Sequence, residues 1–252
     1  MLAFLRLLLA AIFIVITTLF ASVYCLFSPR NAKHVYFFCR WFNQLHKLIG
    51  VKLIQRGLDN APTPKNSVYI SNHQSVYDFV TDPGMLRPRT VTLGKKELIW
   101  VPFFGFLYWI TGNIMIDRQD KSKARDTIKQ VADAIHQRNL SVWAYPEGTR
   151  SKGRGLLPFK TGAFRMAIEA GVPITPMVVS STHNKFDLNR SNNGIVISEM
   201  LEPIDVSNYK LSDARALAEH CHTLMAEKIA QLDAEVAKLE QQNAPDQIAT
   251  DQ

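Results

Sequence analysis

The sequence predicts an α/β protein whose mixed, mainly parallel sheet is covered by helices, with an N-terminal hydrophobic membrane anchor and a C-terminal amphipathic helix. Three features indicate this fold: an uncharged apolar run near the start, short β-rich runs alternating with helical stretches from residue 51 onward, and a late segment with apolar residues at helical spacing. We expect four regions: an anchor with an interfacial helix (1–50), an α/β domain (51–206), a C-terminal helix (207–240) and a polar tail (241–252).

The charge is unevenly distributed along the chain. Its 252 residues are 47% hydrophobic and 20% charged, an ordinary globular composition that argues against collagen, a long disordered chain or a multi-span transporter. Residues 1–206 hold 25 basic and 14 acidic side chains, whereas residues 207–252 hold 4 and 8. The positive charge of the front part favours an anionic partner, such as anionic lipid, nucleic acid or a phosphorylated small molecule.

Residues 7–27 form an apolar run of 21 residues without a charge. As a helix this run would be about 31 Å long, close to the roughly 30 Å hydrocarbon core of a bilayer. A cleaved signal peptide is the alternative, but the run ends in YCLF and not in a small-x-small site. Arg6 precedes the run, whereas basic residues crowd behind it, so the positive-inside rule places the rest of the chain on the cytoplasmic side. These basic residues are Arg30, Lys33, Arg40, Lys47, Lys52 and Arg56.

The next segment, residues 35–50, mixes aromatic and aliphatic side chains with polar ones. It is too short and too polar to span a bilayer. It suits a helix that lies in the headgroup layer, or an amphipathic helix packed on the protein's own core, and the sequence leaves both open. A hairpin of residues 7–27 and 35–50 that enters one leaflet also stays open.

From residue 51 onward, β-rich runs alternate with helical stretches. The expected strands are residues 51–56, 67–70, 90–93, 113–116, 141–145, 174–180 and 194–200. The expected helices are residues 75–85, 121–137, 161–170 and 213–239. The last helix carries an apolar stripe at helical spacing, formed by Leu217, Cys221, Leu224, Ile229, Leu232, Val236 and Leu239.

A first group of polar residues follows the second expected strand, in the segment NHQSVYD (72–78). His73 and Asp78 are too far apart to meet within a strand or a continuous helix, but a strand-to-helix turn can join them, because Ser75-x-x-Asp78 resembles a capping box. Asp78 would then accept a hydrogen bond from one imidazole nitrogen while the other takes a proton from a substrate hydroxyl. The alternative is structural: Ser75 caps the helix, Asp78 complements its N-terminus, and His73 is a loop histidine.

A second group follows a later strand, in the segment YPEGTRS (145–151). Pro146 and Gly148 turn the chain and leave Glu147 and Arg150 at the carboxyl edge of the sheet, where open α/β sheets bind ligands. The guanidinium of Arg150 suits a phosphate, although a solvated basic loop is the alternative. Further candidate phosphate ligands are Lys95, Lys96 and Arg118.

Two other sets of residues are assigned no chemistry. The aromatic cluster of Trp100, Phe103, Phe104, Phe106, Tyr108 and Trp109 is expected to be core rather than a lipid groove. Cys25, Cys39 and Cys221 lack metal or redox spacing and are expected to be small buried side chains in a reducing compartment. His73 and Asp78 lack a third ligand at recognisable spacing, so no metal site is predicted.

Four blocks resemble the glycerolipid acyltransferases, and most closely their bacterial 1-acyl-sn-glycerol-3-phosphate acyltransferase branch. NHQSVYD resembles the NHx4D motif of that family. KKEL (95–98) with Pro102 and Gly105, and then IDR (116–118), resemble its second block. YPEGTR (145–150) and VPITP (172–176) resemble the third and the fourth. One departure is Tyr145, where the family usually has phenylalanine.

The resemblance implies a role for each matching residue. His73 would be the catalytic base and Asp78 its orienting partner. The phosphate of the acceptor would be held by Lys95, Lys96, Arg118 and Arg150, and the glycerol pocket would be shaped by Glu147 and Gly148, with Thr149 also binding substrate. The reaction would move an acyl chain from an acyl-CoA or acyl-carrier-protein thioester to the sn-2 hydroxyl of lysophosphatidic acid, giving phosphatidic acid, with no bound cofactor. We expect membrane lipids as partners, no nucleic acid, and a location on the cytoplasmic face of a bacterial inner membrane.

Several other functions remain open at this point. Within the family, the acceptor could be glycerol 3-phosphate, another lysophospholipid or an aminolipid. A non-catalytic membrane protein that binds phospholipid would use the same basic residues. A hydrolase is disfavoured because the chain has no G-x-S-x-G elbow and no cysteine near a motif histidine. Nucleic-acid binding is disfavoured because no recognisable binding module is present.

Overall fold

The computed structural model describes residues 1–58, 66–102, 104–116 and 124–243. In these residues a seven-stranded sheet has the order β1-β7-β6-β2-β5-β3-β4, and its neighbours run parallel except for β6 and β7. The strands are β1 (Lys52–Arg56), β2 (Val68–Ser71), β3 (Thr90–Lys95), β4 (Ile114–Ile116), β5 (Ser141–Ala144), β6 (Ile174–Val179) and β7 (Ile195–Met200). The predicted mixed, mainly parallel sheet is therefore confirmed, and each strand lies within two residues of its expected bounds.

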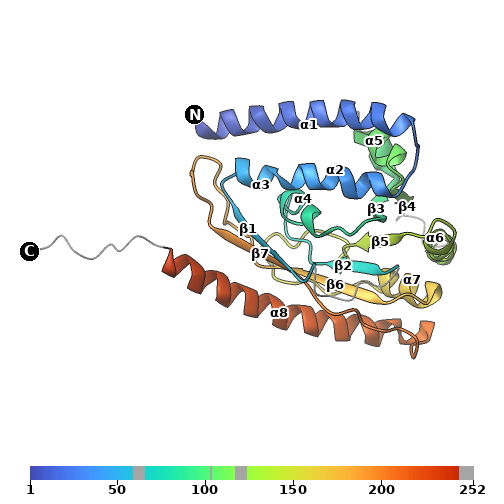
Figure 1. The fold of residues 1–252 in the computed structure, drawn as a ribbon. Coiled ribbons are helices and arrows are strands. Elements are labelled where there is room, and N and C mark those ends of the chain that lie inside the picture. The colour runs from blue at the N-terminus through green and yellow to red at the C-terminus, as the bar shows by residue number, and fades with distance from the viewer. Residues whose placement is uncertain (59–65, 103, 117–123, 244–252) are drawn as a thin grey trace, which may run out of the picture.

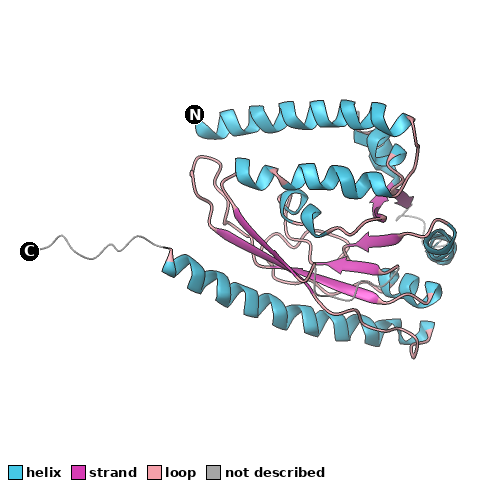
Figure 2. Cartoon of the chain, viewed as in Figure 1, coloured by secondary structure: helices cyan, strands magenta, loops and turns pink. Residues whose placement is uncertain are grey.

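Helices cover both faces of this sheet, as Figures 1 and 2 show. They are α1 (Leu2–Leu26), α2 (Lys33–Asn43), α3 (Leu45–Leu48), α4 (Asp78–Thr81), α5 (Phe104–Ile110), α6 (Ala124–Gln137), α7 (Gly162–Ala170) and α8 (Ala214–Gln242). Short 3₁₀ helices are η1 (Pro83–Met85), η2 (Lys96–Trp100) and η4 (Leu211–Asp213). α8 packs on β6 and β7 and on α7, while α2 lies between the sheet and α1.

The core lies between the central strands and the helices on either face. Every residue of β2 and of β6 is buried, which explains their nearly continuous apolar sequences. The predicted stripe of α8 supplies several of the buried side chains on one face, among them Leu217, Cys221, Leu232 and Val236. This stripe confirms the expected C-terminal amphipathic helix.

α1 is the outer helix on the α2 side of the sheet (Figure 1), and both of its ends contact the α/β domain. The buried guanidinium of Arg6 donates to the backbone carbonyls of Leu188, Arg190 and Ser191. At the other end, Cys25 packs in a cluster with Leu107 of α5. Among the described residues α1 is the one helix long and apolar enough to cross a membrane, and 17% of its most apolar stretch is buried.

α2 is packed on the protein's own core along one side. Its buried residues are His34, Val35, Phe38, Phe42 and Asn43. On its other side Phe37 and Trp41 are exposed, and they pack against aromatic rings of α1, with Trp41 stacked on Phe20 at 5.6 Å between ring centroids. Of the two predicted positions, α2 therefore has the one packed on the protein's own core. Its outer side is aromatic and continues the apolar surface of α1.

Two local predictions are wrong. The helix expected at residues 75–85 is split into α4 and η1, because Pro83 has no amide hydrogen to continue it. The aromatic cluster near residue 100 is not a buried core: Trp100 is 83% exposed, Phe106 43% and Trp109 40%. Phe104 and Tyr108 are half-buried, and the Tyr108 hydroxyl lies 2.6 Å from that of Thr92 in β3. Phe103 and the polar tail after Asn243 lie outside the described residues.

Candidate active site

The site begins where β2 ends and the chain turns into α4. His73 lies in this turn, and its Nδ1 is 2.6 Å from Oδ2 of Asp78, the first residue of α4. The buried Asp78 carboxylate also accepts the backbone amides of Gln74, at 2.6 Å, and Ser75, at 3.1 Å. The carboxylate therefore folds back over the start of the helix and fixes both the backbone and the imidazole.

This contact determines which imidazole nitrogen is open. An ionised carboxylate can only accept hydrogen bonds, so Nδ1 carries the hydrogen and Nε2 keeps a free lone pair. Within the described part of the chain no hydrogen bond reaches Nε2, and the His73 side chain is 20% exposed. The arrangement is that of a general base, with one nitrogen oriented and the other able to take a proton.

The side-chain amides of Asn72 and Gln74, on either side of His73, bind this turn to the end of β6. The Asn72 side chain donates to the carbonyl of Val179 and accepts its amide, both at 2.9 Å, which extends the β2–β6 pairing by one side chain. The Gln74 side chain donates to the Ser180 carbonyl at 2.9 Å and accepts the Thr182 amide at 2.8 Å. In the sequence these two residues can be noticed because they flank His73. Only the fold shows that they bond to the end of β6 and the residues after it.

The segment after β5 packs directly on the histidine turn. Glu147 is 3% exposed, and its two oxygens accept the amides of His73, at 2.6 Å, and Leu157, at 2.9 Å. Burial raises the pKa of Glu147, while these two hydrogen bonds oppose the rise. The Ser151 amide in turn donates to the His73 carbonyl at 2.8 Å. Glu147 thus positions the backbone of the histidine turn; its predicted contact with substrate stays a prediction.

The backbone conformation at the tip of this segment favours glycine. Gly148 has φ +70°, and a Cβ placed there would lie 2.7 Å from Nζ of Lys160. The amide of Lys160 donates to the Pro146 carbonyl at 2.8 Å, which brings this lysine under the turn. Thr149 and Arg150 lie exposed on the outside of the same turn.

Two of the remaining cationic candidates, Lys95 and Lys96, lie at the same edge of the sheet. β3 ends at Lys95, and both Lys95 and Lys96 are exposed. Because β5 separates β3 from β2, their strand ends are about 10 Å apart at the usual strand spacing. No contact joins either lysine to His73 in the described ranges, and Arg118 lies outside them. The structure therefore brings His73, Asp78, Glu147 and Gly148 together, and Lys95, Lys96 and Arg150 are exposed at or after the ends of β3 and β5.

A tyrosine ring covers one face of the imidazole. The rings of Tyr145 and His73 are stacked, with centroids 4.0 Å apart and planes at 17°. The Tyr145 hydroxyl donates to Oδ2 of Asp82 at 2.8 Å, and Asp82 is 3% exposed. In the sequence Tyr145 stands out only because the family usually has phenylalanine there, and no motif links it to Asp82, which lies 63 residues earlier.

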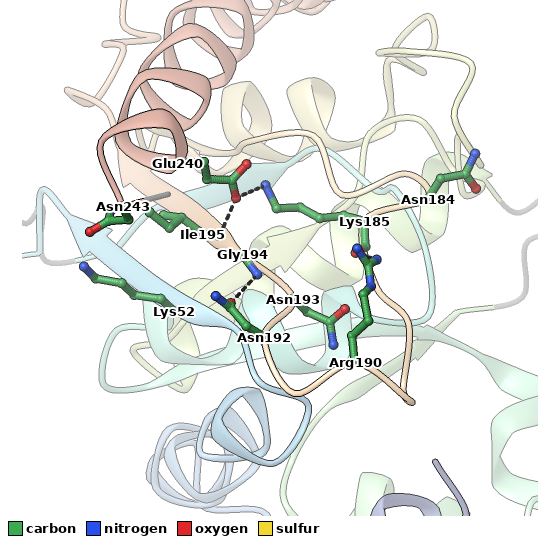
Figure 3. Close-up of a pocket in the computed structure, with 10 residues that line it drawn as sticks. All are labelled: Lys52, Asn184, Lys185, Arg190, Asn192, Asn193, Gly194, Ile195, Glu240 and Asn243. Carbon is green, nitrogen blue, oxygen red and sulfur yellow. Dashed lines mark hydrogen bonds and ion pairs between the residues drawn. The ribbon is translucent and has the colours of Figure 1, made fainter. Parts of the chain in front are cut away.

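A cavity of about 610 Å³ lies farther along the same sheet edge (Figure 3), at the starts of β1 and β7. Its polar groups are mostly engaged: Glu240 accepts Nζ of Lys185 at 2.8 Å and the amide of Ile195 at 2.7 Å, and Arg190 donates to the Lys185 carbonyl at 2.7 Å. These bonds fasten the end of α8 to β7. None of the lining residues belongs to the four blocks.

Comparison with known proteins agrees with this geometry. The sequence model of the family described as "Acyltransferase" matches residues 52–180, which include all four blocks. The 1-acyl-sn-glycerol-3-phosphate acyltransferase of Escherichia coli is 53% identical over 95% of this chain and 98% of that protein, and the Haemophilus influenzae protein of the same name is 50% identical over 94% and 99%. The solved 1-acyl-sn-glycerophosphate (LPA) acyltransferase of Thermotoga maritima shares the fold, with a TM-score of 0.70, 21% identity, and coverage of 93% of this chain and 98% of that chain. The chain is therefore an enzyme of the acyltransferase family.

Proposed function

We propose that the protein transfers an acyl chain from an acyl-CoA or acyl-carrier-protein thioester to the sn-2 hydroxyl of 1-acyl-sn-glycerol 3-phosphate, giving phosphatidic acid. The observation that carries the proposal is the His73–Asp78 pair, whose Nε2 is open at the carboxyl edge of the sheet. The relatives with 50 to 54% identity over nearly the whole chain bear the name of this activity, which supports the acceptor.

In the proposed reaction His73 acts as the general base. Nε2 takes the proton of the sn-2 hydroxyl as the oxygen attacks the thioester carbonyl carbon. The tetrahedral intermediate then collapses, the carbon–sulfur bond breaks, and the leaving thiolate takes the proton back from Nε2. Asp78 keeps Nδ1–H in place and stabilises the transient imidazolium. The thioester is already activated, so no acyl-enzyme is needed.

The acceptor phosphate would be held by the cations around this pair. Lys95 is the last residue of β3, Lys96 begins η2 and Arg150 follows β5, and all three are exposed. In the sheet β5 lies next to β2, and β3 lies beyond β5. The planar guanidinium of Arg150 suits two phosphate oxygens, and the lysines add positive field. Arg118 belongs to the same proposed set. Both lysophosphatidic acid and glycerol 3-phosphate carry such a phosphate, so the acceptor test below includes both.

We propose that the protein binds the cytoplasmic face of a bacterial inner membrane through one leaflet. The outer side of α1 exposes apolar side chains along its length, and the exposed Trp100, Phe106 and Trp109 lie on η2 and α5, the latter packed against α1. Because Arg6 and Cys25 attach both ends of α1 to the domain, the helix runs along the domain surface instead of projecting from it. A lysolipid would then reach the site without leaving the bilayer surface.

An acceptor and donor panel tests the proposed function. Membranes containing the protein are given a labelled acyl-CoA or acyl-carrier protein together with lysophosphatidic acid, glycerol 3-phosphate, another lysophospholipid or an aminolipid. The proposal predicts labelled phosphatidic acid from lysophosphatidic acid, and at least about a hundredfold less with the His73→Ala variant. Faster transfer to another acceptor would reassign the substrate. Phospholipid binding without any transfer would instead support a non-catalytic binding protein.

A further inference from the structure

The buried carboxyl group of Asp82 has no part in the proposed reaction. Its Oδ2 accepts the Tyr145 hydroxyl at 2.8 Å and its Oδ1 accepts the Thr81 hydroxyl at 2.8 Å. No hydrogen bond joins Asp82 to His73 in the part of the chain that the structure describes. Burying a carboxyl group costs free energy, and Asp82 also lies four residues after the carboxylate of Asp78. Asp82 is buried despite this cost, and it bonds to Tyr145, which stacks on His73. A role in positioning His73 would account for its burial.

The stacked tyrosine connects Asp82 to the imidazole. The hydrogen bond from Nδ1 to Asp78 fixes one direction in the imidazole plane, but it leaves the ring able to rock about the line joining the two atoms. The Tyr145 ring, 4.0 Å away and nearly parallel, opposes that rocking by contact with the imidazole face. The Tyr145 ring is itself held at its far end, because its hydroxyl is tied to a buried acceptor.

We propose that Asp82 and Tyr145 form a positioning pair for the catalytic base: the carboxyl group fixes the tyrosine hydroxyl, and the fixed ring holds the imidazole plane so that Nε2 points at the acceptor hydroxyl. This inference rests on the proposed role of His73. When Nε2 takes the proton, the imidazolium also gains from lying on an electron-rich ring. A phenylalanine would supply the stacking ring but not its attachment to Asp82.

The electrostatics of the pair fit this role. Burial, and then the nearby Asp82, raise the pKa of Tyr145 well above its usual value, so the phenol stays protonated as a donor. Because Asp82 accepts that hydrogen, an asparagine in its place would still offer a carbonyl oxygen to the phenol, whereas an alanine would offer none. Comparing Asp82→Asn with Asp82→Ala therefore separates the effect of losing the hydrogen-bond acceptor from the effect of losing the carboxylate charge.

The test is a double-mutant cycle on the purified full-length enzyme, with kcat, KM for lysophosphatidic acid and the melting temperature measured for each variant. Tyr145→Phe and Asp82→Ala should each lower kcat about tenfold, with KM within about twofold, because a misplaced base slows the chemistry rather than binding. The double variant should also lose about tenfold and not the roughly hundredfold of independent effects. Asp82→Asn should restore kcat to within about threefold of the wild type.

Three results would overturn the proposal: an unchanged kcat in Tyr145→Phe, losses that multiply in the double variant, or losses confined to KM. A purely structural role would lower the melting temperature of Asp82→Ala while leaving the kcat of the folded fraction intact, and it too would overturn the proposal. His73→Ala keeps the two proposals distinguishable. If His73→Ala is inactive while Tyr145→Phe has normal activity, the proposed positioning pair is rejected and the proposed base is retained. If His73→Ala is active, the proposed base is itself rejected.

Discussion

The carboxylates near His73 are fixed by several donors each. Asp78 accepts the imidazole nitrogen and two backbone amides, and Glu147 accepts one amide from the histidine turn and one from Leu157. Such groups lose little entropy when the substrate binds, because their positions are set before it arrives. The sequence indicated Asp78 through its spacing from His73, but it indicated Glu147 as a substrate ligand, since nothing in the sequence shows that its carboxylate turns inward.

Replacing Glu147 with glutamine tests this inward position. Glutamine keeps the size, but its NH₂ would face one of the two amide hydrogens that the carboxylate now accepts. Leaving a buried donor unsatisfied costs about 1–3 kcal/mol, so we expect a lower urea midpoint and a kcat about tenfold lower. The matched control is Glu169→Gln, which changes an exposed glutamate on α7. Equal midpoints in the two variants would contradict the assigned hydrogen bonds.

Asp82 predicts a pH dependence of stability with a definite sign. Burial, and then the Asp78 charge, raise the pKa of Asp82 well above its usual value of 3.8. Between the unfolded pKa and the folded one, the folded protein binds more protons at this group, so its contribution to stability falls as the pH rises. Asp82→Asn removes the titration. We expect this variant to melt above the wild type at pH 8, with a smaller difference at pH 4, by circular dichroism in detergent. A difference that grows toward acid would contradict the assignment.

Among the helices and strands, the sequence predicts correctly those whose position is set by hydrophobic periodicity and by turn residues at their ends. All seven strands were found because their short apolar runs are bounded by turn residues, and α8 because its stripe is long. α5 was missed because it packs against α1, with Phe106 and Trp109 exposed and the Tyr108 hydroxyl bonded to Thr92 of β3, and periodicity does not tell these surroundings apart. Likewise, the packed position of α2 depends on β3 and η1, which come later in the chain.

One end of α1 is attached to the domain by Arg6, which is interpreted from the sequence alone as the charge before the apolar run. Arg6 is buried and donates to three carbonyls of the loop before β7. Arg6→Met should release this end of the helix, since the carbonyls lose their donor, and hydrogen exchange in residues 2–12 should rise about tenfold or more. Arg165→Met, on the exposed side of α7, is the control. Exchange equal to that of the control would show that the arginine does not hold the helix.

For the molecule as a whole, we propose that the apolar surface binds the membrane while the edge that carries His73 receives the lysolipid from it. α1, α5 and Trp100 of η2 carry exposed apolar side chains, and they are near in sequence to two exposed lysines, Lys95 at the end of β3 and Lys96 at the start of η2. Aromatic and basic side chains in this order suit the boundary between acyl chains and headgroups. The front part of the chain is also strongly basic, which favours an anionic leaflet and an acidic or phosphorylated acyl donor.

Cysteine labelling distinguishes a helix in one leaflet from a helix that crosses. In a variant without Cys25, Cys39 and Cys221, single cysteines at Ala3 and Ser28 mark the two ends of α1. Since both ends are attached to the domain, an impermeant maleimide should label both positions from the cytoplasmic side of membrane vesicles and neither from the other side. Labelling of the two positions from opposite sides would show that α1 spans the bilayer.

The proposed role of His73 as the base is decided by the kinetics of the His73→Ala enzyme. General-base catalysis contributes about 10² to 10⁴ in rate, so kcat for acyl transfer to lysophosphatidic acid should fall by at least about a hundredfold, while equilibrium binding of the lysolipid to the purified protein changes by less than about threefold. An active His73→Ala enzyme would contradict the account, and so would an equal loss of lysolipid binding.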